Sequence, residues 1–261
     1  MKVLKFGGSS VANSENIKKV LAIVEQESKN QKVAVVVSAF GKTTDQLLSA
    51  ANKALKNITE AKETLETIKK LHVEIINDLI TTHKEEVSVE VSELFKKLLS
   101  IYEGLNLLKE LSDKTAAKIA SFGERLSSLI IANAAKELFD ATHGESRKLI
   151  TTNNDYLNAQ VNFKITDKNI TSFFEQNKHQ VVVFGGFISS NSKNETTTLG
   201  RGGSDYSASI YAAALDAISA ALLKSTDSII VMSLIVPVAS INIFIPAAVS
   251  KLGPSTIAIK S

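Results

Sequence analysis

Short apolar runs alternate with a helical pattern at the start of the chain. Residues 1–6 (MKVLKF) and 32–40 (KVAVVVSAF) are continuous apolar runs that end in glycine or small residues, as strands buried on both faces of a parallel sheet do. The apolar positions between them recur at helical spacing: Ile17, Val20, Leu21 and Val24. Ser14 stands where a helix cap is expected. The pattern therefore predicts a strand, a helix and a second parallel strand.

The middle of the chain has the periodicity of long helices. Two apolar stripes run through it, formed by Leu65, Ile68, Leu71, Ile75 and Leu79 and by Leu94, Phe95, Leu98 and Tyr102. A third helical stretch, residues 114–138, contains Gly123. Glycine inside a helix costs about 1 kcal/mol relative to alanine. A requirement other than helix stability is therefore expected to select glycine at this position.

Strand patterns return in the second half, at residues 147–151 (RKLIT) and 180–187 (QVVVFGGF). Residues 188–198 (ISSNSKNETTT) are polar and rich in turn formers, which predicts an exposed hairpin or flap. A further helix is expected to begin near Ser204. This alternation of strands and helices predicts an α/β fold with a mainly parallel sheet.

Composition fits one large α/β domain, or one domain with a small appendix. The 261 residues are 44% hydrophobic and 22% charged, and 30 Lys and Arg against 27 Asp and Glu leave a net charge of +3. The basic residues are spread along the chain, so neither a nucleic acid nor an acidic membrane is an expected partner. The absence of cysteine excludes disulfides and a cysteine nucleophile. The four histidines lie far apart, without the ligand spacing of a zinc site.

Residues 228–250 carry no charge, and about twenty uncharged residues are enough to span a membrane. However, Pro237, Asn242 and Pro246 interrupt the run, and its β-branched pieces are more typical of buried strands. No membrane span is therefore predicted. The N terminus opens directly into a strand pattern without the apolar core of a signal peptide, so the expected location is cytoplasmic.

Small residues follow three predicted strands, at Gly7-Gly8, Ser38-Ala39 and Gly185-Gly186. The carboxyl ends of the strands form the ligand crevice of an open α/β sheet, and glycine lets backbone N–H groups approach a phosphate. Lys5 precedes the first glycine pair, within reach of such phosphate oxygens. Neither a Walker motif nor a dinucleotide fingerprint is present, and a glycine pair by itself also fits a tight turn.

The segment GRGGSD, residues 200–205, places an arginine beside a predicted helix N terminus. Ser204 and Asp205 stand where the helix begins, so unpaired N–H groups and the positive end of the helix dipole face the same place as Arg201. An isolated aspartate there would be interpreted as a helix cap. Beside Arg201 and three glycines, the pattern favours an anion-binding site.

Five motifs occur together and in order: KFGGSS, VVVSA followed by Thr43-Thr44-Asp45, SFGERLS, GGF and TTTLGRGGSDYSA. Through them the chain resembles the amino-acid kinase family over about residues 1–215. Within that family it resembles the aspartokinases, most of all the kinase half of bifunctional aspartokinase–homoserine dehydrogenases. The resemblance implies a three-layer α/β/α sandwich with a mainly parallel sheet, forming a catalytic domain over residues 1–216.

The resemblance also implies an activity, the transfer of the ATP γ-phosphoryl group to the side-chain carboxylate of L-aspartate. The product is 4-phospho-L-aspartate, on the route to lysine, threonine and methionine. Mg²⁺ is expected to accompany ATP, held largely by phosphate oxygens. The attacking carboxylate is already ionised at neutral pH, so no general base is required.

Roles follow for the matching residues. Lys5 is expected to stabilise the transferring phosphoryl group, and Asp205 to organise Lys5 and the metal-bound nucleotide. Arg201 is expected to bind the α-carboxylate of aspartate through a bidentate pair, and Glu124 its α-ammonium group. Further contacts with aspartate are expected from Ser38 and Thr44, and close approach from Gly123. Phosphate contacts are expected from Gly7, Gly8, Ser9, Gly202, Gly203 and Ser204.

The resemblance weakens after Leu215, where the family has an apolar strand ending in a Thr-Asp-Val-Asp-Gly-like segment that binds the nucleotide. Thr226-Asp227 lies near the expected place, but no such strand is legible before it. Residues 217–261 are therefore expected to be an incomplete remainder. Two explanations stay open: residues missing from about 217–226 and again near 236, or an atypical kinase.

Pieces of this remainder, STDSIIVMS, INIFI and STIAIKS, resemble strands of an ACT domain, an amino-acid-sensing module. The resemblance implies feedback inhibition by threonine or lysine and a homo-oligomer. Two other functions stay open. One is a non-catalytic regulatory subunit that binds an amino acid, and the other is a sister kinase for glutamate, N-acetylglutamate or UMP. Arg201 with Glu124 favours a free amino acid, because N-acetylation removes the charge that Glu124 needs.

Overall fold

The structure, a computed structural model, describes residues 1–216, 218–225 and 228–234, and a six-stranded sheet lies at its centre. In spatial order its strands are β3 (Ala141–Gly144), β5 (Val181–Gly185), β2 (Val33–Val37), β1 (Lys2–Phe6), β8 (Ile218–Ser225) and β9 (Ser228–Leu234). Every neighbouring pair is parallel except β8 and β9. The strand β1 therefore lies inside the sheet, with its carboxyl end beside those of β2 and β8.

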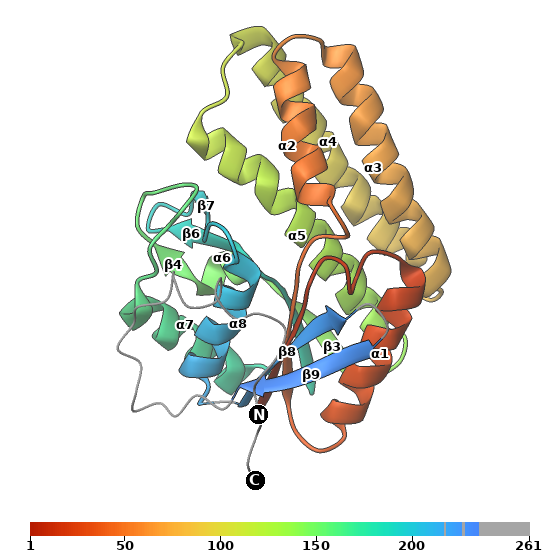
Figure 1. The fold of residues 1–261 in the computed structure, drawn as a ribbon, viewed down its shortest axis with the longest axis vertical. Coiled ribbons are helices and arrows are strands. Elements are labelled where there is room, and N and C mark those ends of the chain that lie inside the picture. Colours follow the sequence, from red (N-terminus) through yellow and green to blue (C-terminus); the bar gives the residue numbers. More distant parts are fainter. Residues whose placement is uncertain (217, 226–227, 235–261) are drawn as a thin grey trace.

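Helices cover both faces of this sheet, because its strands bury both sets of alternating side chains. Along β2, Val33, Val35 and Val37 join one apolar cluster, whereas Ala34 and Val36 join another. The first cluster includes side chains of α1 (Ser14–Ser28), α2 (Thr43–Ala54), α3 (Ile58–Leu79), α4 (Lys84–Leu108) and α5 (Asp113–Lys136). The second includes side chains of α6 (Ser146–Leu149), α7 (Phe163–Gln176) and α8 (Gly203–Ala214). These three layers (Figure 1) confirm the expected α/β/α sandwich.

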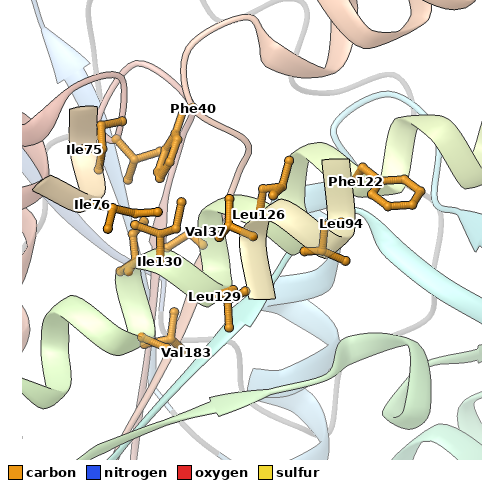
Figure 2. Packing of buried hydrophobic residues seen from close by; sticks show 14 of the residues in the cluster. Val37, Phe40, Ile75, Ile76, Leu94, Phe122, Leu126, Leu129, Ile130 and Val183 are labelled. Carbon is orange, nitrogen blue, oxygen red and sulfur yellow. The ribbon is translucent and has the colours of Figure 1, made fainter. Parts of the chain in front are cut away.

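The helix α5 is the central element of the first layer. Figure 2 shows its residues Leu126, Leu129 and Ile130 packed in one cluster with Val37 and Val183 of the sheet and with side chains of α3 and α4. The helices α2, α3 and α4 extend beyond the sheet (Figure 1). The two apolar stripes predicted from periodicity lie on the buried faces of α3 and α4, so this part of the helical prediction is confirmed.

Three local predictions are corrected by the structure. Residues 147–151 are not a strand: most of them form the short helix α6, whose first turn is capped by the Glu145 side chain, and β4 (Thr151–Thr152) follows. The strand of the main sheet is the preceding β3, which lies at the sheet edge and lacks an apolar run. The cap of α1 is Asn13, whose side chain accepts from the Asn16 amide, and not Ser14.

The predicted hairpin exists, formed by β6 (Ile188–Asn191) and β7 (Thr196–Thr198), but its strands are buried rather than exposed. With β4 it makes a second, three-stranded sheet. Its polar side chains bond to one another: the Thr197 hydroxyl oxygen lies 2.9 Å from that of Ser189 and 2.7 Å from that of Thr152. Internal pairing therefore lets a polar sequence occupy a buried position.

The segment after Leu215 also differs from expectation. The strand β8 pairs in parallel with β1 and ends immediately before Thr226, so an apolar strand does precede that residue. Residues 228–234, compared above with an ACT strand, form β9 and extend the main sheet. Both strands follow the predicted boundary at residue 216 and pair within the main sheet. The segments INIFI and STIAIKS lie outside the described residues.

None of the helices in the described part of the chain combines the length and the apolar character that crossing a membrane requires.

Close packing explains the glycine within α5. A Cβ atom on Gly123 would lie 2.5 Å from Thr44 Oγ1 and 2.8 Å from the Ala39 Cβ atom. Both distances are shorter than a normal van der Waals contact. The helix α5 can therefore approach Ala39 and the first turn of α2 only at a position without a side chain. In contrast, a Cβ atom on Gly104 of α4 would meet nothing within 4 Å.

We predict that Gly123→Ala destabilises the protein, because the clash outweighs the gain of about 1 kcal/mol in helix propensity. The matched change Gly104→Ala should stabilise it by up to that amount. Urea unfolding of both variants, followed by circular dichroism, measures the two effects. Equal stabilisation by both changes would mean that α5 does not need a glycine at this approach.

Candidate functional site

The loops that follow β1, β2 and β5 meet at one edge of the main sheet. The Gly41 amide donates to the Gly8 carbonyl at 3.1 Å, and the Gly186 amide donates to the Val37 carbonyl at 2.9 Å. The Ser38 hydroxyl donates to the hydroxyl of Ser204, in the first turn of α8, at 3.0 Å. We call this junction of three strand ends and one helix N terminus the strand-end site.

Lys5 and Asp205 meet at this site. Lys5 leaves β1 with its side chain 12% exposed, and its Nζ lies 2.7 Å from Oδ1 of Asp205, whose side chain is 64% exposed. Asp205 lies in the first turn of α8, where the helix dipole adds positive charge, although the Gly203 and Asp205 amides already donate to the Gly200 and Gly202 carbonyls. The Lys5 ammonium group also lies close above the backbone of Gly7. The site therefore places the Lys5 ammonium group beside the solvent-facing carboxylate of Asp205.

The glycines of the site allow backbones to come together. A Cβ atom on Gly8 would lie 2.8 Å from the Gly41 carbonyl oxygen, and one on Gly186 would lie 2.7 Å from the Ser204 Cβ atom. Gly202, at the cap of α8, has a φ of 74°, which favours glycine, and a Cβ atom on Gly203 would meet the Phe187 ring. Loop packing by itself is therefore sufficient to select glycine at these positions.

Glu124 is buried on α5, with 5% of its surface exposed. One carboxylate oxygen accepts the Ala39 amide at 3.3 Å, and the Thr44 hydroxyl lies 3.4 Å from the other. No ion pair of Glu124 is found within the described part of the chain. Burial raises the pKa of Glu124 to about 8, against the opposing effect of the Ala39 and Thr44 hydrogen bonds. The site thus contains a buried carboxyl group whose ionised form a bound cation would stabilise.

Ser127 is a residue of this site that sequence reasoning missed. Its hydroxyl donates to the Ser38 carbonyl at 2.9 Å and so ties α5 to the end of β2. It follows Glu124 by three residues, on the same side of the helix. That spacing within the SFGERLS motif was the available signal.

Two predicted site residues stay apart from these contacts. Arg201 is exposed, between Gly200 and Gly202 with φ values of 73° and 74°. It makes no hydrogen bond or ion pair with any other described residue. Ser9 is also exposed, and its carbonyl accepts the side-chain amide of Asn16 at 2.9 Å. Among the described residues there is no cluster of three potential metal ligands from His, Cys, Asp and Glu.

The parallel sheet, with charged and small residues gathered at its strand ends, defines an open α/β protein of the class that binds ligands at that edge. The sequence pattern described as the amino acid kinase family matches residues 1–232. This chain therefore belongs to the amino-acid kinase family.

Individual relatives agree with this assignment. The bifunctional aspartokinase/homoserine dehydrogenase of Buchnera aphidicola is 32% identical over 235 residues, covering 88% of this chain and 29% of that protein. The aspartokinase of Chlamydia pneumoniae is 36% identical over 211 residues, covering 80% of this chain and 44% of that protein. This chain thus spans less than half the length of these relatives.

Solved structures show the same arrangement. Aspartokinase III of E. coli in complex with aspartate and ADP matches with a TM-score of 0.77 and 28% identity, over 86% of this chain and 50% of that chain. Its complex with lysine and aspartate matches with a TM-score of 0.75 and 27% identity, over 85% and 49%.

We predict that Glu124→Gln changes how stability depends on pH. A carboxyl group with a pKa raised to about 8 binds more protons in the folded than in the unfolded state, so it lowers stability as pH rises from about 5 to about 8. The variant lacks this titration. Its stability relative to the original chain should therefore increase over this range, by about 2–4 kcal/mol.

Urea unfolding at several pH values checks this expectation. The control is Glu63→Gln, which replaces an exposed carboxylate on α3. If the free energies of unfolding of Glu124→Gln and Glu63→Gln change in parallel with pH, burial does not hold Glu124 in its protonated form.

Proposed function

We propose that this chain is the kinase part of an ATP-dependent aspartate kinase. It would transfer the γ-phosphoryl group of ATP to the side-chain carboxylate of L-aspartate and so form 4-phospho-L-aspartate. The observation that carries the proposal is the Lys5–Asp205 pair at the N terminus of α8, with Nζ and Oδ1 2.7 Å apart. Membership of the amino-acid kinase family and likeness to a structure with bound aspartate and ADP support it.

The chemistry at this pair requires charge neutralisation rather than proton transfer. A carboxylate oxygen of aspartate forms a bond to the γ-phosphorus, the bond from that phosphorus to the bridging oxygen breaks, and ADP leaves. The Lys5 ammonium group and the positive end of the α8 dipole would neutralise the charge on the transferring group. Gly7, Gly8, Ser9, Gly202, Gly203 and Ser204 would supply backbone and hydroxyl donors around the phosphates.

Mg²⁺ would neutralise charge on the ATP phosphates, whose oxygens would supply most of its ligands. Asp205 suits this arrangement, because its carboxylate is 64% exposed beside the Lys5 ammonium group. It would orient Lys5 toward the phosphates and interact with the metal-bound nucleotide.

The amino-acid end of the substrate would lie against Glu124. Glu124 is buried without a cationic partner among the described residues, and the α-ammonium group of aspartate would supply that charge. Ser38, whose hydroxyl donates to that of Ser204, and Thr44, whose hydroxyl lies beside Glu124, would add polar contacts. Arg201, exposed on its glycine-flanked turn, would bind the α-carboxylate once substrate is present.

Regulation belongs to the proposal as well. The chain would be inhibited by an amino acid, lysine or threonine. The likeness to aspartokinase III in complex with lysine and aspartate supports this class of effector. A homo-oligomer, an ACT module formed partly by residues after 234 and a cytoplasmic location remain predictions.

The direct test is ADP release by the purified chain with ATP and Mg²⁺. We expect turnover with L-aspartate and none above background with N-acetylglutamate or UMP, because a free ammonium group is needed opposite Glu124. Asp205→Asn should lower kcat by about 100-fold. Asp113→Asn, which changes a carboxylate in the first turn of α5, should leave kcat within about twofold.

Two results would count against this proposal. Aspartate binding without any ADP release would favour a non-catalytic amino-acid-binding subunit. Undiminished turnover in Asp205→Asn would remove Asp205 from the reaction.

We also predict that aspartate binding releases a proton near neutral pH. Glu124, with a pKa of about 8, must ionise to pair with the ammonium group, so apparent affinity should rise with pH up to about that value. Titration calorimetry in buffers of different ionisation enthalpy measures the release, expected to approach one proton per site near pH 7. Glu124→Gln should abolish it and weaken aspartate binding more than ATP binding. Equal weakening of both ligands would contradict the role of Glu124.

A further inference from the structure

A second concave site lies on the other side of α5, away from the contacts of Glu124. It is a cavity of about 550 Å³ between α4, α5 and α6. Its lining residues are Glu93, Lys96, Lys97, Ser100, Ile101, Lys118, Phe122, Arg125 and Arg147. No residue of this set belongs to the proposed kinase site.

Positive charge dominates this cavity. Five of its nine lining residues are Lys or Arg, and one is acidic. The acid, Glu93, is paired with Lys96 at 2.6 Å, and Arg147 is paired with Glu145 outside the lining. Lys97, Lys118 and Arg125 have no carboxylate partner among the described residues. The negative charges near them are Glu145, beside Arg125, and Glu93, beside Lys97, so positive groups still outnumber negative ones around this space.

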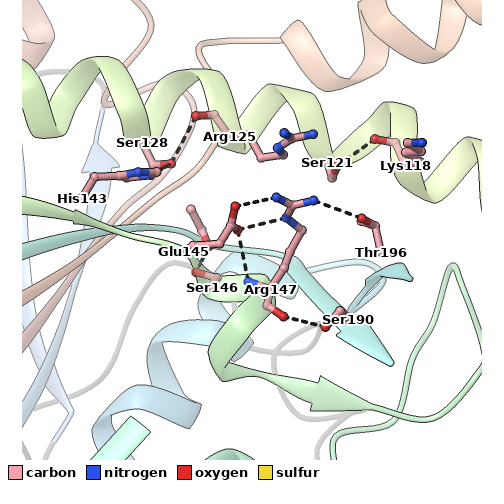
Figure 3. A network of polar contacts seen from close by, with 11 residues as sticks. Lys118, Ser121, Arg125, Ser128, His143, Glu145, Ser146, Arg147, Ser190 and Thr196 are labelled. Carbon is pink, nitrogen blue, oxygen red and sulfur yellow. Dashed lines mark hydrogen bonds and ion pairs between the residues drawn. The ribbon is translucent and has the colours of Figure 1, made fainter. Parts of the chain in front are cut away.

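The guanidinium of Arg125 packs against an aromatic ring and donates no hydrogen bond to another residue in the described part of the chain. Its Cζ lies 4.4 Å above the centre of the Phe122 ring, and the side chain is half-buried. Arg147 occupies the neighbouring acceptors: it donates to both oxygens of Glu145 and to the Thr196 hydroxyl, as Figure 3 shows. Burial first, and then the positive charge of Arg147, lower the pKa of Arg125 to about 10. A bound anion would offset both effects, because a nearby negative charge favours the charged form of Arg125.

The two sites use different faces of one helix. Glu124 contacts Ala39, after β2, and Thr44 of α2, whereas Arg125, the next residue, lies on the side of α5 that faces Glu145 and Arg147 (Figure 3). A residue step of about 100° around the helix separates the two directions. A ligand in the basic cavity would therefore leave the strand-end site free.

We infer that the basic cavity binds a small anion of the phosphate class that carries two or more negative charges. Its volume lies within the range of small-molecule sites, about 300–1,000 Å³. A guanidinium group offers paired donors to phosphate oxygens, and lysines add mobile point charges. Ile101 adds apolar surface for the rest of such a molecule. The inference does not depend on the proposed kinase activity.

Calorimetric titration with pyrophosphate at low ionic strength, without Mg²⁺, tests the inference. The Lys5→Met variant serves as the starting protein, because it lacks the phosphate-facing lysine of the strand-end site. We expect pyrophosphate to bind this variant, and the added pair Lys97→Gln and Lys118→Gln to weaken binding at least tenfold. Raising the salt concentration should also weaken it.

The matched control is the pair Lys69→Gln and Lys70→Gln on α3. These lysines line a smaller cavity of about 260 Å³, where Glu66 and Glu74 balance their charge. Their removal should change pyrophosphate affinity less than twofold. Binding that is lost in Lys5→Met alone, or that falls equally with both lysine pairs, would overturn the inference. Neither result measures aspartate-dependent ADP release. A failure of the basic-cavity inference can therefore be distinguished from a failure of the proposed function.

Discussion

The parallel pairing of β1 with β2 and β8 is the constraint on which the arrangement of the site depends. Because β1 is inside the sheet, its carboxyl end, with Lys5 and Gly7, lies beside the ends of its neighbours. The helix α8 then packs on the same sheet and brings Asp205 to Lys5 across about 200 residues of sequence. If β1 were at an edge of the sheet, the loop that follows it would have a neighbouring strand end on one side only.

A buried carboxyl group would give this junction its chemical selectivity. Glu124 is held by one amide and one hydroxyl, which is insufficient to compensate a charge removed from water. Its raised pKa expresses that deficit. A cationic ligand would correct it, whereas a neutral one would leave Glu124 protonated. Selectivity for a charged amine would then follow from burial together with hydrogen bonding.

The helix α5 contributes residues to two sites, because different sides of it contact different parts of the molecule. One side supplies Gly123, Glu124 and Ser127 to the strand-end site, and Arg125, one residue step beyond Glu124, faces the basic cavity. Side chains between them pack in the main apolar cluster. A rigid helix can therefore hold an acidic and a basic site close together without neutralising either.

Periodicity was sufficient to predict the first strands, the long helices and an α/β fold, because these depend on neighbours within a few residues. The three-layer α/β/α class and the candidate pair Lys5 and Asp205 followed from the motifs by which the chain resembles the amino-acid kinase family. The pairing of β8 and β9 with β1 and the helix at residues 146–149 depended on which sheet edge and which buried neighbours were available. The burial of Glu124 and the grouping of Lys97, Lys118 and Arg125 were likewise decided by tertiary structure. Desolvation and charge repulsion arise between residues far apart in sequence, so no local pattern contains them.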